Sequence, residues 1–351
     1  MSPTTRPAWW SLAELEAVLR EPFALEDLGA STVPLVVATL PRVADELPDW
    51  LLQALDSMRA VSVGVVSSPL GASAADLAGH FDVLLAPPEL SGEAMVPVDD
   101  VDLAIDALTG AVVTNPQASI ALAELLRIGA YRSVPQGLVA ESLTYSTLQA
   151  GPEFAEWLTQ RGQIEVPPDR EPPVLTARQG TSLAITLNRP RRANAMTASM
   201  RDQLVEALRV AAIEPSIEGV VLRGSGTSFC SGGDLAEFGS APDPATGHAT
   251  RLLRSPAWWV HRLARDTRAH LHGSCIGAGI ELPSFAGTVV GAADTVIRLP
   301  EISMGLVPGA GGTVSLPRRI GRHRTAYLGI TGAQLDAAEA LAWGILDRID
   351  A

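Results

Sequence analysis

His272-Gly-Ser-Cys-Ile-Gly-Ala-Gly-Ile-Glu-Leu282 joins a short predicted strand, residues 269–272, to the start of a predicted helix. Glycine and other small residues in such a turn let the backbone come close to a ligand. The first turn of the helix then presents unpaired N–H groups and the positive end of its dipole. The stretch therefore indicates an α/β fold with a ligand site built from main-chain donors.

A second glycine turn, Phe229-Cys-Ser-Gly-Gly-Asp-Leu235, follows the buried strand predicted at residues 219–223. Two such turns that face each other would make an oxyanion hole from backbone N–H groups. Each turn alone is more often a device for tight packing. Neither turn matches Gly-x-Gly-x-x-Gly followed by an acidic residue, and the chain has no Walker A sequence. Dinucleotide and nucleoside-triphosphate sites are therefore disfavoured.

Strand and helix patterns alternate around the two turns, which favours a parallel or mixed sheet flanked by helices. In the helix predicted at residues 197–212, Ser199 and Asp202 form the expected capping pair. The other elements predicted in the back half are strands at 182–188 and 293–298 and a helix at 251–265.

A proline-rich stretch at residues 164–174 contains two Pro-Pro pairs and predicts an extended linker. It divides the chain into a front domain, residues 1–170, and a back domain, residues 171–351. The front domain shows no nucleotide loop, metal cluster or catalytic triad, so we expect a scaffold or an interaction surface. Its predicted strands are at 35–39, 61–66 and 81–85, and its predicted helices are at 101–128 and 137–160.

The net charge of −13 is distributed unevenly over the 351 residues. Residues 1–170 contain 8 arginines against 23 acidic residues, a net charge of −15, whereas residues 171–351 contain 18 against 16, a net charge of +2. The acidic front half disfavours nucleic acid and anionic membranes as partners. The arginine-rich back half could accept a phosphorylated ligand. All 26 basic residues are arginine, which excludes a mechanism through a lysine Schiff base.

The two cysteines, Cys230 and Cys275, do not form a Cys-x-x-Cys pair, so no metal or redox centre is predicted. No signal peptide opens the chain. No apolar run reaches the ~18 residues that a membrane span needs. We therefore expect a soluble, cytoplasmic protein that does not bind a metal.

Taken together, the segments from about residue 177 to residue 347 resemble the crotonase, or enoyl-CoA hydratase/isomerase, superfamily. The resemblance implies a crotonase-like ββα spiral core, with an additional N-terminal domain that is α/β or mostly helical. The stretches that carry it stand in the family's order: Asn188-Arg-Pro-Arg-Arg-Ala-Asn-Ala-Met196, Phe229–Leu235, Gly277-Ala-Gly-Ile-Glu281 and Pro300-Glu-Ile-Ser-Met-Gly-Leu-Val-Pro-Gly-Ala-Gly-Gly-Thr313.

This resemblance implies roles for individual residues. The backbone N–H groups of Gly233 and Ala278 would hold the thioester oxygen, and Ala278 can replace the family's glycine if its φ is negative. Glu281 and Glu301 would be the catalytic pair, although a helix-dipole partner and a surface turn are their ordinary structural interpretations. The residues implied for CoA binding are Arg191, Arg192, Asn194, Ala195, Ser231 and Leu235. Those implied for the acyl pocket are Trp258, Trp259, His261, Pro308 and Gly309.

Members of the family continue into a helical tail that covers the acyl site and helps to assemble trimers, whereas this sequence stops at Ala351. Residues 101–128 and 137–161 have a pattern similar to that tail, which indicates a rearranged or degenerate second crotonase segment. We therefore expect residues 101–161 to pack against the back domain and to form part of the pocket wall or of an oligomer interface. The alternative is an independent acidic module that docks another protein.

The resemblance favours hydration of an α,β-unsaturated acyl-CoA, with CoA as part of the substrate and no further cofactor. Glu281 would activate water and Glu301 would give a proton to Cα. Other crotonase reactions stay open, namely isomerisation, decarboxylation, C–C bond hydrolysis and cofactor-free oxygenation. So does a non-catalytic CoA-binding scaffold subunit. The expected assembly is a homo-oligomer, a trimer or hexamer. The acyl group and the choice between CoA and a carrier protein are not fixed by the sequence.

Overall fold

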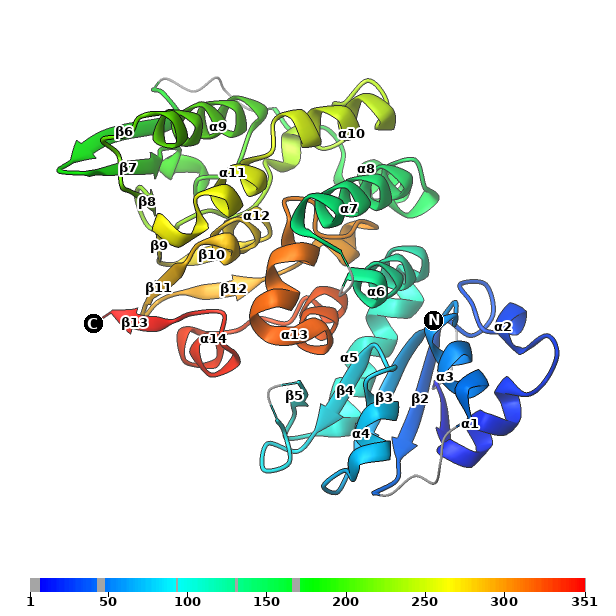
Figure 1. Cartoon of the computed structure of the whole chain (residues 1–351). Coiled ribbons are helices and arrows are strands. Elements are labelled where there is room, and N and C mark those ends of the chain that lie inside the picture. The colour runs from blue at the N-terminus through cyan, green and yellow to red at the C-terminus, as the bar shows by residue number, and fades with distance from the viewer. Residues whose placement is uncertain (1–6, 43–47, 93, 130–131, 166–170, 351) are drawn as a thin grey trace.

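The front half of the chain forms a five-stranded sheet in which the strands follow their order in the sequence (Figure 1). All of its neighbouring strands are parallel. The computed structural model describes residues 7–42, 48–92, 94–129, 132–165 and 171–350. The strands are β1 (Ala8–Ser11), β2 (Leu35–Leu40), β3 (Val61–Val66), β4 (Val83–Ala86) and β5 (Val96–Pro97), so the three predicted strands are confirmed.

The two faces of this sheet are buried against different partners. Val36 and Leu40 of β2 lie in a core made with the helices that follow the first strands. Leu35 and Val37 point to the opposite face, as the period of two in a strand requires, and lie in a core shared with the back half. The helices of the front half that precede residue 100 are α1 (Leu12–Leu19), α2 (Ala24–Asp27), α3 (Asp49–Asp56) and α4 (Ala72–Ala78).

Four helices connect the two halves, where the sequence predicted two. Each long helical pattern is interrupted by a proline that becomes the first residue of the next helix, a position where its missing N–H costs nothing. No helix in the described ranges is long and apolar enough to cross a membrane. The four helices are α5 (Val101–Thr114), α6 (Pro116–Gly129), α7 (Val134–Gln149) and α8 (Pro152–Arg161).

The back half carries a six-stranded sheet and a two-stranded sheet, with strand orders β13-β11-β9-β8-β7-β6 and β10-β12. The same order occurs twice: a strand of the large sheet is followed by a strand of the small sheet and then by a short helix. This is the expected ββα arrangement. The strands are β6 (Val174–Gln179), β7 (Ser182–Leu187), β8 (Gly219–Gly224), β9 (Thr267–Leu271), β10 (Ser274–Ile276), β11 (Thr288–Ala292), β12 (Val296–Arg298) and β13 (Arg348–Asp350).

Three details of the back half differ from the sequence prediction. The helix predicted at 251–265 is divided at Pro256, and the strand predicted at 293–298 begins only at Val296. Helix α9 is capped by the Thr197 side chain, which accepts from the N–H of Met200, and not by the predicted Ser199. The main helices are α9 (Ala198–Ile213), α10 (Pro244–Leu253), α11 (Pro256–Arg262), α12 (Ala278–Glu281), α13 (Gly312–Thr331) and α14 (Ala337–Trp343).

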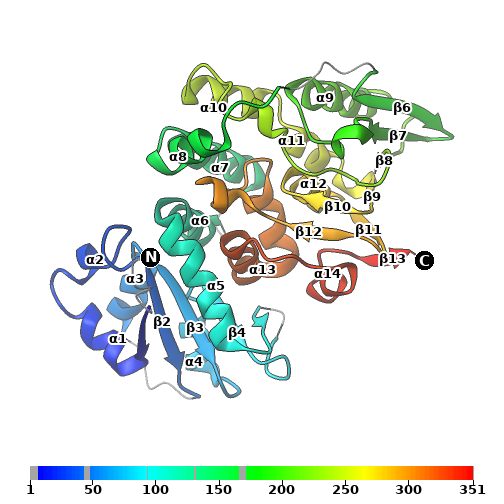
Figure 2. The same ribbon diagram turned by 180° about the vertical axis from the view of Figure 1, so that it is seen from behind.

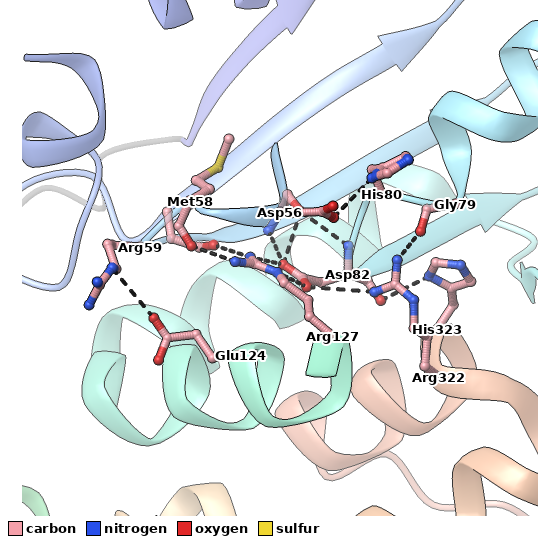
Figure 3. A network of polar contacts seen from close by, with 12 residues as sticks. Asp56, Met58, Arg59, Gly79, His80, Asp82, Glu124, Arg127, Arg322 and His323 are labelled. Atoms are coloured by element: carbon pink, nitrogen blue, oxygen red, sulfur yellow. Dashed lines mark hydrogen bonds and ion pairs between the residues drawn. The ribbon is translucent and has the colours of Figure 1, made fainter. Parts of the chain in front are cut away.

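The two halves share one core and a buried polar network. Helix α13 packs on α5, α6, α7 and β4. Figure 3 shows Asp82, at the start of β4, accepting hydrogen bonds from Arg127 of α6 at 2.7 and 2.6 Å. The ring of His323 on α13 lies 3.1 Å from the Asp82 carbonyl oxygen. The back half is therefore fixed to the front sheet. The predicted linker falls partly on residues 166–170, which lie outside the described residues.

Candidate active site

A cavity of about 410 Å³ lies where α7 and α10 approach the start of α13. Helices α5 and α6 lie between the front sheet and the back half, whereas α7 packs on α10 (Figure 2). The cavity wall consequently combines residues from both halves, with Leu138, Glu141 and Tyr145 of α7 opposite residues of the glycine turns. Its volume is in the range of small-molecule sites, roughly 300–1,000 Å³.

The two glycine turns lie side by side in the fold. Cys230 and Cys275 pair in a parallel β-bridge, and Gly233 and Ala278 each lie three residues farther along. Glycine is needed at position 279, because a Cβ there would lie 2.1 Å from the carbonyl oxygen of Cys230. Both Gly233 and Ala278 line the cavity. Within the described part of the chain, neither of their N–H groups has a hydrogen-bond acceptor.

Ala278 satisfies the condition that the sequence placed on it. It is the first residue of α12 and does not have a positive φ. Its side chain therefore causes no strain, and its N–H belongs to the unpaired first turn of a helix.

Glu281 ends α12 and is only 2% exposed. One of its oxygens accepts the N–H groups of Ala310 at 2.7 Å and Gly312 at 2.8 Å. Burial raises the pKa of Glu281 from its usual 4.5 to about 7, and the two N–H bonds oppose that rise. A carboxyl with a pKa near 7 that is held in one orientation is suited to moving a proton at neutral pH.

Glu301 begins the 3₁₀ helix η5 (Glu301–Met304) and is 8% exposed. Its Oε2 atom is buried without a hydrogen-bond partner among the described residues. The other oxygen lies against Gly277, where a Cβ would approach it to 2.5 Å. Burial first, and then the charge of Glu281, raises the pKa of Glu301 well above its usual value. An unpaired buried carboxyl that lines a cavity is unusual and points to a ligand.

The back half of the chain matches a known protein family. The family model described as enoyl-CoA hydratase/isomerase matches residues 177–351. The 2,3-dehydroadipyl-CoA hydratase of Escherichia coli is 33% identical over 178 residues, which are 50% of this chain and 68% of that protein. A putative enoyl-CoA hydratase/isomerase of Bacillus subtilis is 33% identical over 168 residues, 48% of this chain and 65% of that protein.

The chain belongs to the enoyl-CoA hydratase/isomerase family. Among solved structures, the enoyl-CoA hydratase of Mycobacterium smegmatis is 31% identical and covers 52% of this chain and 71% of its own, with a TM-score of 0.48. The matched part spans roughly two thirds of the curated relatives' length (65% and 68%). The family match confirms the crotonase superfamily membership that the sequence predicted, and the strands and helices of the back half confirm its mixed α/β core.

A third buried glutamate of this crotonase site was missed by the sequence analysis. Glu141 of α7 is 2% exposed, and its oxygens accept the N–H of Gly311 at 2.7 Å, the N–H of Thr313 at 3.0 Å and the Thr313 hydroxyl at 2.7 Å. Burial, together with the charge of Glu281, raises the pKa of Glu141 to about 8. The available signal was that Glu141 is the one charged residue in the sequence of α7.

Arg251 and Tyr145 are further cavity residues that the sequence analysis did not select. Arg251 lies on α10, with its guanidinium carbon 4.6 Å from the centre of the Tyr145 ring. Tyr145 also packs on the loop before α13, because a Cβ at Gly309 would lie 2.4 Å from its ring. No group of three His, Cys, Asp or Glu side chains that could hold a metal ion is present in the described ranges.

The residues predicted to bind CoA lie beside the cavity and do not line it. Arg191 and Arg192 are exposed on the 3₁₀ helix η1 (Pro190–Arg192), and one nitrogen of Arg192 lies 3.6 Å from Asp234. Asn194 is wholly buried, and its side-chain amide donates to the carbonyl oxygens of Ser225 and Ser228. Its side chain therefore holds the turn. Of the other three, Ala195 is buried, Ser231 is half-buried and Leu235 is exposed.

The acyl-pocket prediction agrees with the structure at Gly309, which lines the cavity, and differs at four other residues. Trp258, Trp259 and His261 belong to α11, which packs on α9 and the 3₁₀ helix η4 (Pro283–Phe285). The His261 ring lies 6.0 Å from Trp258 and 6.1 Å from Phe285, centre to centre. These rings pack against the core, whereas Pro256 and Ala257 at the start of the same helix line the cavity. Pro308 also does not line the cavity.

Proposed function

We propose that the protein adds water to an α,β-unsaturated acyl-CoA. The observation that carries this proposal is the pair of unpaired N–H groups, those of Gly233 and Ala278, which open on the same cavity as Glu281 and Glu301. Main-chain donors of this kind stabilise the negative charge that develops on a thioester oxygen when the double bond is attacked. The two carboxyls supply the proton transfers that hydration requires.

The environments of the two carboxyls favour different roles. Glu281 is held in place by two N–H donors that favour its carboxylate form, and burial raises its pKa to about 7, which suits a base that takes a proton from water. Glu301 has no donor on its buried Oε2 and its pKa is raised further by the charge of Glu281, which suits a protonated acid. Water oxygen bonds to Cβ as Glu281 takes its proton, and Glu301 gives a proton to Cα.

A CoA thioester is the substrate class that the relatives favour. A putative enoyl-CoA hydratase of Thermobifida fusca, 27% identical over the matched part, was solved in complex with acetoacetyl-CoA. In this chain, exposed Arg191 and Arg192 lie five and four residues before the cavity residue Met196 and are the proposed partners of the CoA phosphates. Assembly into a trimer or hexamer stays a prediction.

Isomerisation is the second candidate, because one relative is the 1,2-epoxyphenylacetyl-CoA isomerase of Escherichia coli, at 33% identity. The same two carboxyls could move a proton between carbon atoms without adding water. Product mass separates the two reactions, since hydration adds one water molecule and isomerisation adds nothing.

The test is turnover of crotonyl-CoA by the full chain, followed as loss of the absorbance of the conjugated thioester. We expect hydration by the wild type and a fall in kcat of about 10²–10⁴-fold in Glu281→Gln and in Glu301→Gln. Both variants keep the shape of the side chain, so binding of CoA thioesters should be retained. Normal turnover in both variants would contradict the assignment, and binding without turnover by the wild type would favour the scaffold interpretation.

A further inference from the structure

Arg251 is held in place on the cavity wall by uncharged groups. Its guanidinium donates to the Ser142 hydroxyl at 3.1 Å, the Ser142 carbonyl at 3.3 Å, the Gln149 side chain at 3.1 Å and the Ser146 hydroxyl. All of these acceptors belong to α7, and the face of Tyr145 on the same helix covers the guanidinium. The cation is therefore fixed in one orientation while its charge is left uncompensated by those contacts.

The other two arginines of the cavity wall each have a carboxylate partner. Arg254 lies 3.0 Å from Glu206, and Arg201 lies 2.8 Å from Asp202. Within the described ranges, no carboxylate oxygen lies within 4.0 Å of the guanidinium of Arg251. Arg251 is also more buried than Arg254. A charge without a carboxylate partner is therefore costly to keep at the position of Arg251.

Glu141 is the carboxyl whose charge acts on Arg251, but its oxygens are engaged elsewhere. Its two oxygens accept three hydrogen bonds from Gly311 and Thr313 at the start of α13. Burial lowers the pKa of Arg251, and the charge of Glu141 opposes this shift only in part. The molecule thus keeps a positive charge at this point of the wall without giving it a direct ion pair.

Tyr145 connects Arg251 with the end of the cavity where Glu281 and Glu301 lie. Tyr145 lies between the two, because its ring face contacts Arg251 and its ring edge packs on Gly309, just before the N–H groups that hold Glu281. A substrate whose thioester lies at Glu281 and Glu301 can therefore place the far end of a short acyl chain along Tyr145 and toward Arg251. The planar guanidinium matches a carboxylate in geometry as well as in charge.

We propose that Arg251 binds a carboxylate at the far end of the acyl chain, so that the substrate is a short dicarboxylic enoyl thioester. This inference rests on the proposed function, because it names the substrate class of the same cavity. The neutral hydrogen bonds from α7 hold the guanidinium ready, and the incoming carboxylate supplies the missing charge. An uncharged acyl chain of the same length leaves the charge of half-buried Arg251 uncompensated.

The experiment compares kcat/KM of the full chain on glutaconyl-CoA and on trans-2-pentenoyl-CoA, which have five acyl carbons each and differ in the terminal carboxylate. We expect wild type to prefer glutaconyl-CoA by about 10- to 100-fold, the range that a hydrogen bond to a charged group supplies. In Arg251→Gln that ratio should fall to about 1. Arg209→Gln removes the same charge outside the cavity, where Arg209 pairs with Glu206 on the surface, and should keep the wild-type ratio.

A wild-type ratio near 1, or one that favours the uncharged thioester, would overturn the proposal. A second measurement needs no variant: saturated glutaryl-CoA should bind wild type more tightly than valeryl-CoA by a similar factor, by calorimetry at constant salt. Equal affinities would also overturn it. If neither enoyl thioester is hydrated but glutaryl-CoA binds more tightly, the proposed hydratase activity fails and the carboxylate site stands. If both thioesters are hydrated at equal rates, the proposed hydratase activity stands and the carboxylate site fails.

Discussion

Two carboxyls alternate along four consecutive backbone N–H groups at the start of α13. Glu281 takes those of Ala310 and Gly312, and Glu141 takes those of Gly311 and Thr313. The N-terminus of a helix stabilises negative charge, which explains how two acidic side chains can be buried so close together. Burial still raises the pKa of both groups. The backbone of residues 310–313 therefore binds two glutamates, Glu141 and Glu281, that titrate near neutral pH.

The raised pKa of Glu281 makes a prediction about stability. The folded protein keeps the Glu281 proton up to about pH 7, whereas the unfolded chain releases it near 4.5. Stability from this group is therefore complete below pH 4.5 and is lost as the pH rises through 7. The Gln side chain of Glu281→Gln cannot ionise. We therefore expect the variant to be more stable relative to wild type at pH 8 than at pH 5, that is, to have a larger free energy of unfolding relative to wild type. Urea denaturation at the two pH values measures this, and an equal difference at both would contradict it.

The backbone donor of Ala278 can be removed with little change elsewhere. Ala278 is the first residue of α12, a position where proline is tolerated. Ala278→Pro should lower kcat by about 10²–10³-fold through the loss of one oxyanion donor. Ala278→Gly keeps the N–H and is the matched control, expected near wild-type kcat. Steady-state kinetics with circular dichroism checks both, and full activity in a folded proline variant would rule out this donor.

The sequence could predict Glu281 and Glu301 because each stands in a recognisable motif close to a glycine turn. Glu141 could not be predicted in the same way. It precedes the matched residues 177–351 and meets Gly311 across a separation of 170 residues. Arg251 shows a related limit, because an arginine without a carboxylate partner is recognised only when its surroundings are known. Trp258 and Trp259 were expected in the acyl pocket because they stand in a variable segment, and in the structure they are partly buried and pack against the core.

At the scale of elements, helix boundaries were harder to predict than helix existence. The helical patterns at 101–128 and 137–160 were both correct in type, and both contain a break at a proline that begins a new helix. The position of α7 matters for the site, because α7 packs on α13. In α7, Gly137 packs so closely on Val314 of α13 that a Cβ would lie 2.9 Å from that side chain.

The contact between α7 and α13 can be tested by adding volume. Gly137→Leu should destabilise the protein by about 1–3 kcal/mol through overpacking. It should also lower kcat, because α7 carries Glu141 and Tyr145. Gly110 of α5 has open space around it, so Gly110→Ala is the control and should stabilise by about 0.5–1 kcal/mol through helix propensity. Thermal unfolding and kinetics measure both variants. A Gly137→Leu protein as stable and active as wild type would show that this contact does not position α7.

At the scale of the whole molecule, the front half contributes part of the cavity wall. The core that contains the back-half strands also contains residues of β2, β3, α5, α6 and α7. The buried pair between Asp82 and Arg127 lies at this junction and helps to fix the geometry. The sequence analysis predicted contact by residues 101–161, which the packing of α5–α7 on α13 agrees with. It did not predict a five-stranded sheet behind those helices, because three short apolar runs do not specify how they pair.

Removal of the front half should therefore destroy the enzyme. A chain that begins at about residue 174 would expose the apolar face of α13 that now packs on α5 and α6, at a cost of roughly 25 cal/mol per Å². We expect this fragment to be insoluble or inactive. Size-exclusion chromatography and crotonyl-CoA turnover check the prediction. A soluble fragment with full kcat/KM would identify the front half as an independent module.

The most direct test of the whole account is a crystal structure of the full-length Glu301→Gln variant with an unsaturated acyl-CoA bound. The two distances to measure join the thioester oxygen to the backbone nitrogens of Gly233 and Ala278. We predict about 3 Å for each, with the acyl chain against Tyr145 of the front half. A thioester bound outside the cavity, or one whose oxygen faces away from both nitrogens, would contradict the proposal that two halves of this chain build one acyl-CoA site.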